Sequence, residues 1–217
     1  SRKEVMSSDF AVEAKGNKIK VIVAKDGELL TESEIASARI ENGCIVPDVE
    51  NDILKITVLN RYDNSKPAVA FIRGIGIKQG ALACSIAHDS HNLIAVGTSD
   101  EAIAGALNKI IESKGGLAAV DAKSSEHLAL PLAGLMSDRK GEEVAALYHA
   151  LNRKAAEMGS PLRAPFMTLA FMALLVIPKL KLSDKGLFDG TNFAFTALCE
   201  VYTSHSETNT SHSDEGL

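Results

Sequence analysis

Residues 80–101 read GALACSIAHDSHNLIAVGTSDE: two apolar segments joined by a polar turn and followed by the first residues of a helix. Alternation of large and small side chains predicts a strand over Gly80–Ala87, and the apolar run Leu93–Gly97 predicts a second one. The large side chains of the first strand share one face: Leu82, Cys84 and Ile86. Alanine and serine fill the other face, which predicts that a large neighbouring element approaches closely there.

Alternation also predicts a strand at Lys18–Lys25, and a β-rich run predicts one at Ile53–Leu59. Further strands are expected at Ala68–Arg73, Gly116–Ala122 and His127–Leu130. The dipeptide Asp26-Gly27 predicts a hairpin turn after the first of these strands. A short helix is expected around Glu32–Ala38.

Two longer helices follow from apolar spacing. The first opens on Thr98-Ser-Asp-Glu, a capping-box pattern, and stops at Gly115. The second runs from about Gly141 to Met158. Strands broken by two amphipathic helices predict an α/β fold of the α+β type, with a mixed or mainly antiparallel sheet flanked by these helices. We expect a polar leader at 1–17, one domain at 18–198 and a loose polar tail at 199–217.

The composition argues against several classes of protein. The net charge is −5 and tryptophan is absent, so a broad nucleic-acid surface is not expected. The longest apolar run, Phe166–Ile177, is 12 residues, shorter than the roughly 20 that a membrane span needs, so it is expected in a core. Three widely spaced cysteines, Cys44, Cys84 and Cys199, argue against a disulfide framework and favour a cytoplasmic protein.

A glycine-rich segment, Gly74–Gly80, resembles a nucleotide loop only superficially. Its spacing is one residue too long for the dinucleotide fingerprint, and a strand rather than a helix follows it. Without a helix N-terminus there is no dipole to hold a pyrophosphate. The segment is therefore expected to be a turn between strands.

The densest polar cluster lies between the two central strands and consists of His88, Asp89, Ser90, His91 and Asn92. Imidazoles serve as acids, bases or metal ligands, and a neighbouring carboxylate can fix their tautomer. The alternative is a hydrogen-bonded structural turn. A self-contained metal site is not expected, because no third ligand stands nearby.

Five segments of the chain, in order, resemble one family. They are Asp52–Tyr62, Phe71–Asn92, Leu130–Asp138, Pro165–Phe171 and Ile177–Leu187. The chain resembles the C-terminal domain of bacterial-type adenine deaminases, which belong to the amidohydrolase superfamily. The resemblance implies hydrolysis of adenine to hypoxanthine and ammonia, with a divalent metal (Mn, Fe or Zn) held by an N-terminal barrel. A barrel of about 250 residues does not fit in this chain, so the chain alone is expected to be inactive.

The resemblance also implies where this chain would act. The N-terminal barrel of the same protein is the expected partner, adenine the expected substrate and a homo-oligomer the expected assembly, with neither nucleic acid nor a membrane involved. His88, Asp89, Ser90 and His91 are the catalytic candidates, and Asn92 is the substrate-binding candidate. Two alternatives remain: a structural or oligomerisation module, and a small-molecule-binding domain unrelated to purines.

Overall fold

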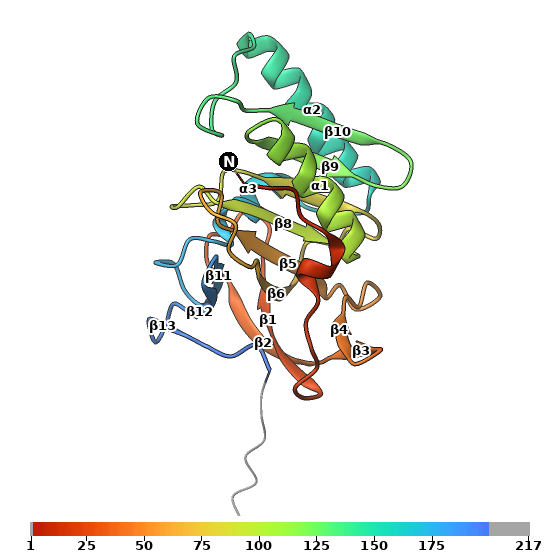
Figure 1. The fold of residues 1–217 in the computed structure, drawn as a ribbon, viewed down its shortest axis with the longest axis vertical. Helices are drawn as coiled ribbons and strands as arrows, with labels where there is room; N and C mark the ends of the chain where they lie inside the picture. Colours follow the sequence, from red (N-terminus) through yellow and green to blue (C-terminus); the bar gives the residue numbers. More distant parts are fainter. Residues whose placement is uncertain (1, 200–217) are drawn as a thin grey trace, which may run out of the picture.

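The computed structural model describes residues 2–199, and its centre is an open eight-stranded sheet (Figure 1). From one edge to the other the strands are β10 (Ser125–Ala129), β9 (Gly116–Val120), β7 (Ala81–Cys84), β8 (Leu93–Gly97), β5 (Leu54–Leu59), β6 (Ala68–Arg73), β1 (Lys18–Val23) and β2 (Glu32–Ser37). Every neighbouring pair is antiparallel except β1 and β6. The predicted fold class is confirmed.

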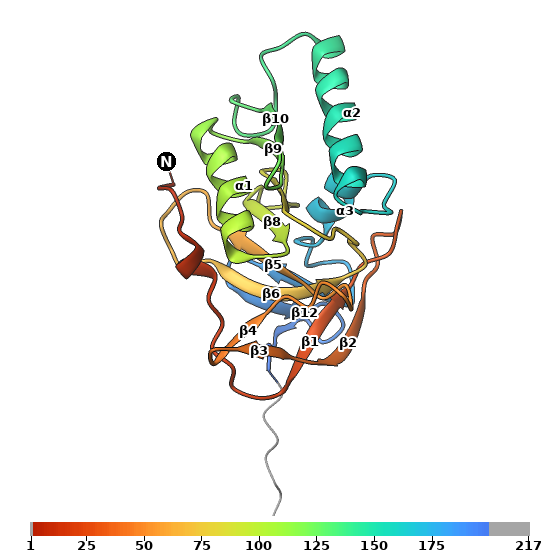
Figure 2. The same cartoon turned by 90° about the vertical axis from the view of Figure 1, so that its right-hand side faces the viewer.

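Helices cover both faces of this sheet. The elements outside it are the 3-10 helix η1 (Ser7–Phe10), the helices α1 (Asp100–Glu112), α2 (Gly141–Glu157) and α3 (Pro165–Phe171), the pair β3 (Arg39–Glu41) and β4 (Cys44–Val46), and a three-stranded sheet of β11 (Leu180–Ser183), β12 (Gly186–Asp189) and β13 (Ala194–Phe195). Figure 2 shows α1 on one side of β9, with α2 and α3 on the other. The core is thus split into two layers by the sheet.

Side-chain size explains which helix lies on which face. Ala81 and Ala83 of β7 pack with α1, whereas Leu82 and Cys84 pack on the side of α2 and α3. A Cβ atom at Gly97 would lie 2.7 Å from a side-chain carbon of α1. The close approach predicted from the small residues of this strand is therefore made by α1. The first seventeen residues also contribute to this layer, through the buried side chains of Val5 and Phe10.

The start of α1 differs by one residue from the prediction. Ser99, not Thr98, is the N-cap, and its side chain accepts a hydrogen bond from the amide of Ala102. Thr98 instead donates its hydroxyl to the carbonyl of Gly80, so it belongs to the sheet. The end of the helix agrees with the prediction, because Gly115 has a φ of 137°, which side-chain-bearing residues rarely adopt.

Strand β2 corrects the expectation of a helix at Glu32–Ala38. The chain turns at Asp26-Gly27, as predicted, but the antiparallel partner of β1 runs from Glu32 to Ser37 rather than from Glu28. Side-chain exposure alternates along β2 with a period of two. The ladder with β1 provides the backbone hydrogen bonds that a short isolated helix would have supplied only weakly.

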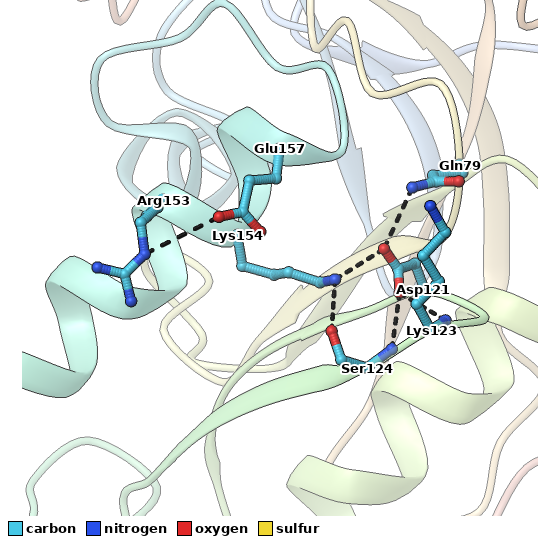
Figure 3. Close-up of polar contacts among 7 residues, drawn as sticks. All are labelled: Gln79, Asp121, Lys123, Ser124, Arg153, Lys154 and Glu157. Atoms are coloured by element: carbon cyan, nitrogen blue, oxygen red, sulfur yellow. Dashed lines mark hydrogen bonds and ion pairs between the residues drawn. The ribbon is translucent and has the colours of Figure 1, made fainter.

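Helix α2 projects from the sheet and is anchored by a buried ion pair (Figure 3). The ammonium of Lys154 lies 2.7 Å from the carboxylate of Asp121 and 2.7 Å from the hydroxyl of Ser124. The side chain of Gln79 donates to the same carboxylate at 3.2 Å. Exposed fractions are only 7% for the lysine side chain and 2% for the aspartate. The hydrogen bond from Lys154 lowers the pKa of Asp121 to about 2.

The apolar run Phe166–Ile177 begins in α3, which contributes to the core as predicted. Phe166 and Leu169 are buried against the sheet. Among residues 2–199, no helix is both long and apolar enough to cross a membrane. Of the tail 199–217, expected to be loose, residues 200–217 lie outside the described residues.

Candidate functional site

The five polar residues His88–Asn92 connect β7 to β8 at one end of the central sheet. The predicted strand Gly80–Ala87 is shorter in the structure, because Ser85 leaves the ladder after Cys84. The Ser85 hydroxyl donates to the carbonyl of Gly134 at 2.5 Å and accepts from the amide of Gly116 at 2.9 Å. This bend directs the following residues out of the sheet.

His88 is held by the end of α3. Its ring stacks on Phe171 with 4.9 Å between centroids and 15° between planes. Its backbone amide donates to the carbonyl of Ala170 at 3.1 Å. The ring is half-buried, so one face is supported by the aromatic ring while part of the imidazole remains accessible.

His91 lies beside it, with 5.9 Å between the two imidazole centroids. Its backbone is in the left-handed region at φ 52°, where histidine is among the better-tolerated residues. The Nδ1 atom is buried and has no hydrogen-bond partner within residues 2–199. Buried polar atoms normally find a partner, so this unpaired atom is an exception within the described chain.

The remaining members of the cluster divide into buried and exposed residues. Asn92 is 3% exposed, and its side-chain oxygen accepts the amide of Arg61 at 3.3 Å. Asp89 and Ser90 are exposed, and neither side chain hydrogen-bonds to another residue of the described range. The structure thus brings the two histidines together and leaves a carboxylate and a hydroxyl facing solvent beside them.

Sequence reasoning missed two residues that contact this turn and a third that contacts the neighbour of Arg61. They are Arg61, Phe171 and Asp184, which come from separate segments of the chain. The Arg61 guanidinium donates to the carbonyl of His91 at 3.2 Å. The Asp184 carboxylate accepts the side-chain amide of Asn60 at 3.0 Å, next to Arg61. The sequence did hold a signal for all three residues, because each lies in one of the five segments that resemble the family.

Two other candidates have structural roles. The glycine-rich Gly74–Gly80 segment connects β6 to β7, as predicted, and the carboxylate of Asp52 accepts the amides of Gly74 and Gly76 at 2.8 and 2.9 Å. These amides are therefore already paired with an anion of the chain itself. Burial raises the pKa of the Cys84 thiol to about 12, so this thiol stays protonated at neutral pH.

A metal centre does not fit the part of the chain that the structure describes. No group of three or more His, Cys, Asp or Glu side chains there is arranged to hold a metal ion. The two histidines of the turn alone make an incomplete set, since catalytic zinc sites take three protein ligands. The arrangement instead suits hydrogen bonding and proton transfer to a ligand.

Comparison with known proteins gives one consistent result. A family model described as the adenine deaminase C-terminal domain matches residues 28–194. An adenine deaminase of Methanosarcina mazei is 56% identical over 181 residues, which is 83% of this chain and 33% of the relative. The adenine deaminase of Salinibacter ruber is 50% identical over 193 residues, 88% of this chain and 35% of the relative. The chain thus spans about a third of the length of these curated relatives.

Proposed function

We propose that this chain forms the C-terminal part of an adenine deaminase and closes the active site of that enzyme. The chain belongs to the adenine deaminase C-terminal domain family. The catalytic domain, an N-terminal amidohydrolase barrel, is supplied by the rest of the protein. The reaction converts adenine and water to hypoxanthine and ammonia. A divalent metal bound in the barrel would supply the activated water, and residues 2–199 hold no group of side chains suited to bind it.

One observation carries this proposal: two neighbouring imidazoles are fixed on a turn that also presents free polar groups. His88 is fixed by stacking on Phe171, and His91 is fixed through its carbonyl by Arg61. A scaffold that orients imidazoles in this way is what acid–base chemistry requires, because proton transfer depends on geometry first. The unpartnered Nδ1 of His91 supports the same interpretation.

The roles follow from the chemistry of deamination. Water adds to C6 of the purine ring, and the amino group must take up a proton before it leaves as ammonia. An imidazole of His88 or His91 would carry that proton or hold a ring nitrogen. Asp89 and Ser90, exposed beside them, would bind the polar edge of the base. Asn92 would donate from its side-chain NH₂ group, because its side-chain oxygen already accepts the backbone amide of Arg61.

The test is substitution in the full-length enzyme. We expect His88→Ala and His91→Ala each to lower kcat/KM by about 100-fold or more, the lower range for losing an acid–base group. His149→Ala is the matched control, because His149 is exposed on α2. The melting temperature is measured for all three variants. Normal activity in folded His88→Ala and His91→Ala proteins would overturn the assignment.

A second function, a structural or oligomerisation module, is favoured by a different observation. Phe193 and Phe195 are 69% and 55% exposed, and both pack edge-on against Phe188 in the three-stranded sheet. Exposed aromatic side chains at one site are typical of protein interfaces. Under this alternative the double variant Phe193→Ser/Phe195→Ser would lower the oligomeric state measured by light scattering, while the histidine variants would leave kcat/KM unchanged.

A further inference from the structure

A small cavity lies between the end of α1, the start of β8 and the N-terminal segment. Its volume is about 200 Å³. Three cationic residues line it, Arg2, Arg61 and Lys114, and no acidic residue does. Leu93 and Ile110 form the apolar part of its wall. We call this the Arg61 cavity.

The described chain neutralises these three cations only in part, through the charges of Asp63 and Asp9 near Arg2. None of them forms an ion pair with a described carboxylate. Arg2 uses its Nη1 atom for three backbone carbonyls, those of Asn60, Asp63 and Ser65. Arg61 donates one hydrogen bond, to the carbonyl of His91.

Both guanidinium groups therefore have N–H donors that are unpaired within the described chain, since a guanidinium has five N–H donors. The Lys114 ammonium has no side-chain partner within residues 2–199. Burial lowers the pKa of Arg2, and the nearby charges of Asp63 and Asp9 act in the opposite direction.

The helix end beside the cavity does not account for this charge. A helix C-terminus carries an effective charge of about −0.5, against three full positive charges. Its last carbonyls are already occupied, because the amides of Ser113, Lys114 and Gly115 donate to those of Lys109, Ile111 and Ile110 respectively. The Ser113 hydroxyl also donates to Lys109. The cations thus remain available to a further negative group.

We propose that the Arg61 cavity binds a small oxyanion of the phosphate class, either inorganic phosphate or the phosphoryl group of a phosphomonoester. Arginine recognises phosphate through paired N–H donors, and lysine adds a point charge. The volume is below the roughly 300 Å³ at which pockets for drug-sized ligands begin, so it suits an ion rather than a whole nucleotide. This site does not depend on the deaminase proposal.

The test is calorimetric titration of the 217-residue chain at constant ionic strength, with sodium phosphate, glycerol 3-phosphate and acetate in separate arms. We expect phosphate to bind with a Kd of about 1 mM or tighter, and acetate to bind more weakly because it carries a single charge. Tighter binding of glycerol 3-phosphate would identify a phosphomonoester as the natural source, and tighter binding of phosphate would identify the free ion.

The variant arm uses Lys114→Gln, which removes the charge but keeps a side chain of similar length. We expect it to weaken phosphate binding by about tenfold or more, as for the loss of a charge-assisted hydrogen bond. Lys114→Arg should restore binding. Lys123→Gln, on the exposed β9–β10 turn, is the matched control and should bind as the parent chain does. A Kd weaker than about 10 mM, or equal weakening in Lys114→Gln and Lys123→Gln, would overturn the proposal.

Discussion

At the scale of single residues, Lys181 is an unusual feature of the core. It is fully buried in β11, and its ammonium donates to the carbonyls of Leu29 and Phe171 at 2.8 and 3.1 Å. No carboxylate within residues 2–199 pairs with it. Burial lowers its pKa to about 8. Because Phe171 also supports the ring of His88, this lysine stabilises the helix end on which the candidate site rests.

The pH dependence of stability tests this placement. The folded pKa of Lys181, about 8, lies below the unfolded value of about 10.4, so the unfolded state binds more protons between these limits. The free energy of unfolding should therefore rise from pH 8 to pH 10 relative to that of Lys181→Met. Urea unfolding at pH 7, 8, 9 and 10 measures it. Lys185→Met, exposed in the same hairpin, should behave as the parent chain; parallel curves for the parent chain and Lys181→Met would contradict the prediction.

At the scale of elements, helix α2 is attached to the sheet through only a few buried side chains. The helix buries a narrow stripe, which includes Leu151 and Ala155, and its strongest polar link is the Lys154–Asp121 pair (Figure 3). Next to it in the same helix, Arg153 and Glu157 form an exposed pair at 3.9 Å. One helix thus carries a buried and an exposed ion pair side by side.

Substituting each pair in turn separates their contributions. Asp121→Asn leaves the Lys154 ammonium buried without its counter-ion and should lower the free energy of unfolding by about 3 kcal/mol. Arg153→Gln should change it by less than about 1 kcal/mol, as usual for exposed pairs. Denaturant unfolding at pH 7 compares them, and equal losses in both variants would contradict the prediction.

The same pair makes a second prediction, on acid stability. The folded pKa of Asp121 is about 2, below the unfolded value of about 3.9, so its contribution is complete above pH 4 and is lost as the pH falls towards 2. The difference in stability between the parent chain and Asp121→Asn should shrink over that interval. A difference that stays constant from pH 5 to pH 2 would show that the carboxylate charge does not matter.

At the scale of the whole molecule, the chain folds around its own two-layered core. It covers 33% and 35% of two relatives named adenine deaminase, and residues 2–199 hold no grouping of metal ligands. The purified chain should therefore not deaminate adenine. Hypoxanthine formation is assayed with added Mn²⁺, Fe²⁺ or Zn²⁺, with a full-length adenine deaminase as the positive control. Turnover of about 1 per second or faster by the chain alone would refute this expectation.

Most strands of the central sheet could be predicted from the sequence, with β2 as the exception, because the relevant signals are local. The alternation along β7, the β-rich runs of β5 and β6, the apolar run of β8 and the apolar stripes of α1 and α2 are all short-range patterns. The family was also readable, since five segments carry it in order. The histidine turn was located for the same reason: a polar cluster between two buried strands must lie at an end of the sheet.

The surroundings of that turn could not be predicted from the sequence, because they depend on long-range packing. Arg61, Phe171 and Asp184 are far apart along the chain, and no spacing rule links them to His88. The nature of β2 was decided in the same way, because a weakly patterned segment takes the conformation that its neighbour's free backbone groups can pair with. Long-range packing also set the state of the charged groups. Whether Lys154 or Lys181 is buried, and whether a carboxylate meets it, depends on strands and loops that the local sequence does not specify.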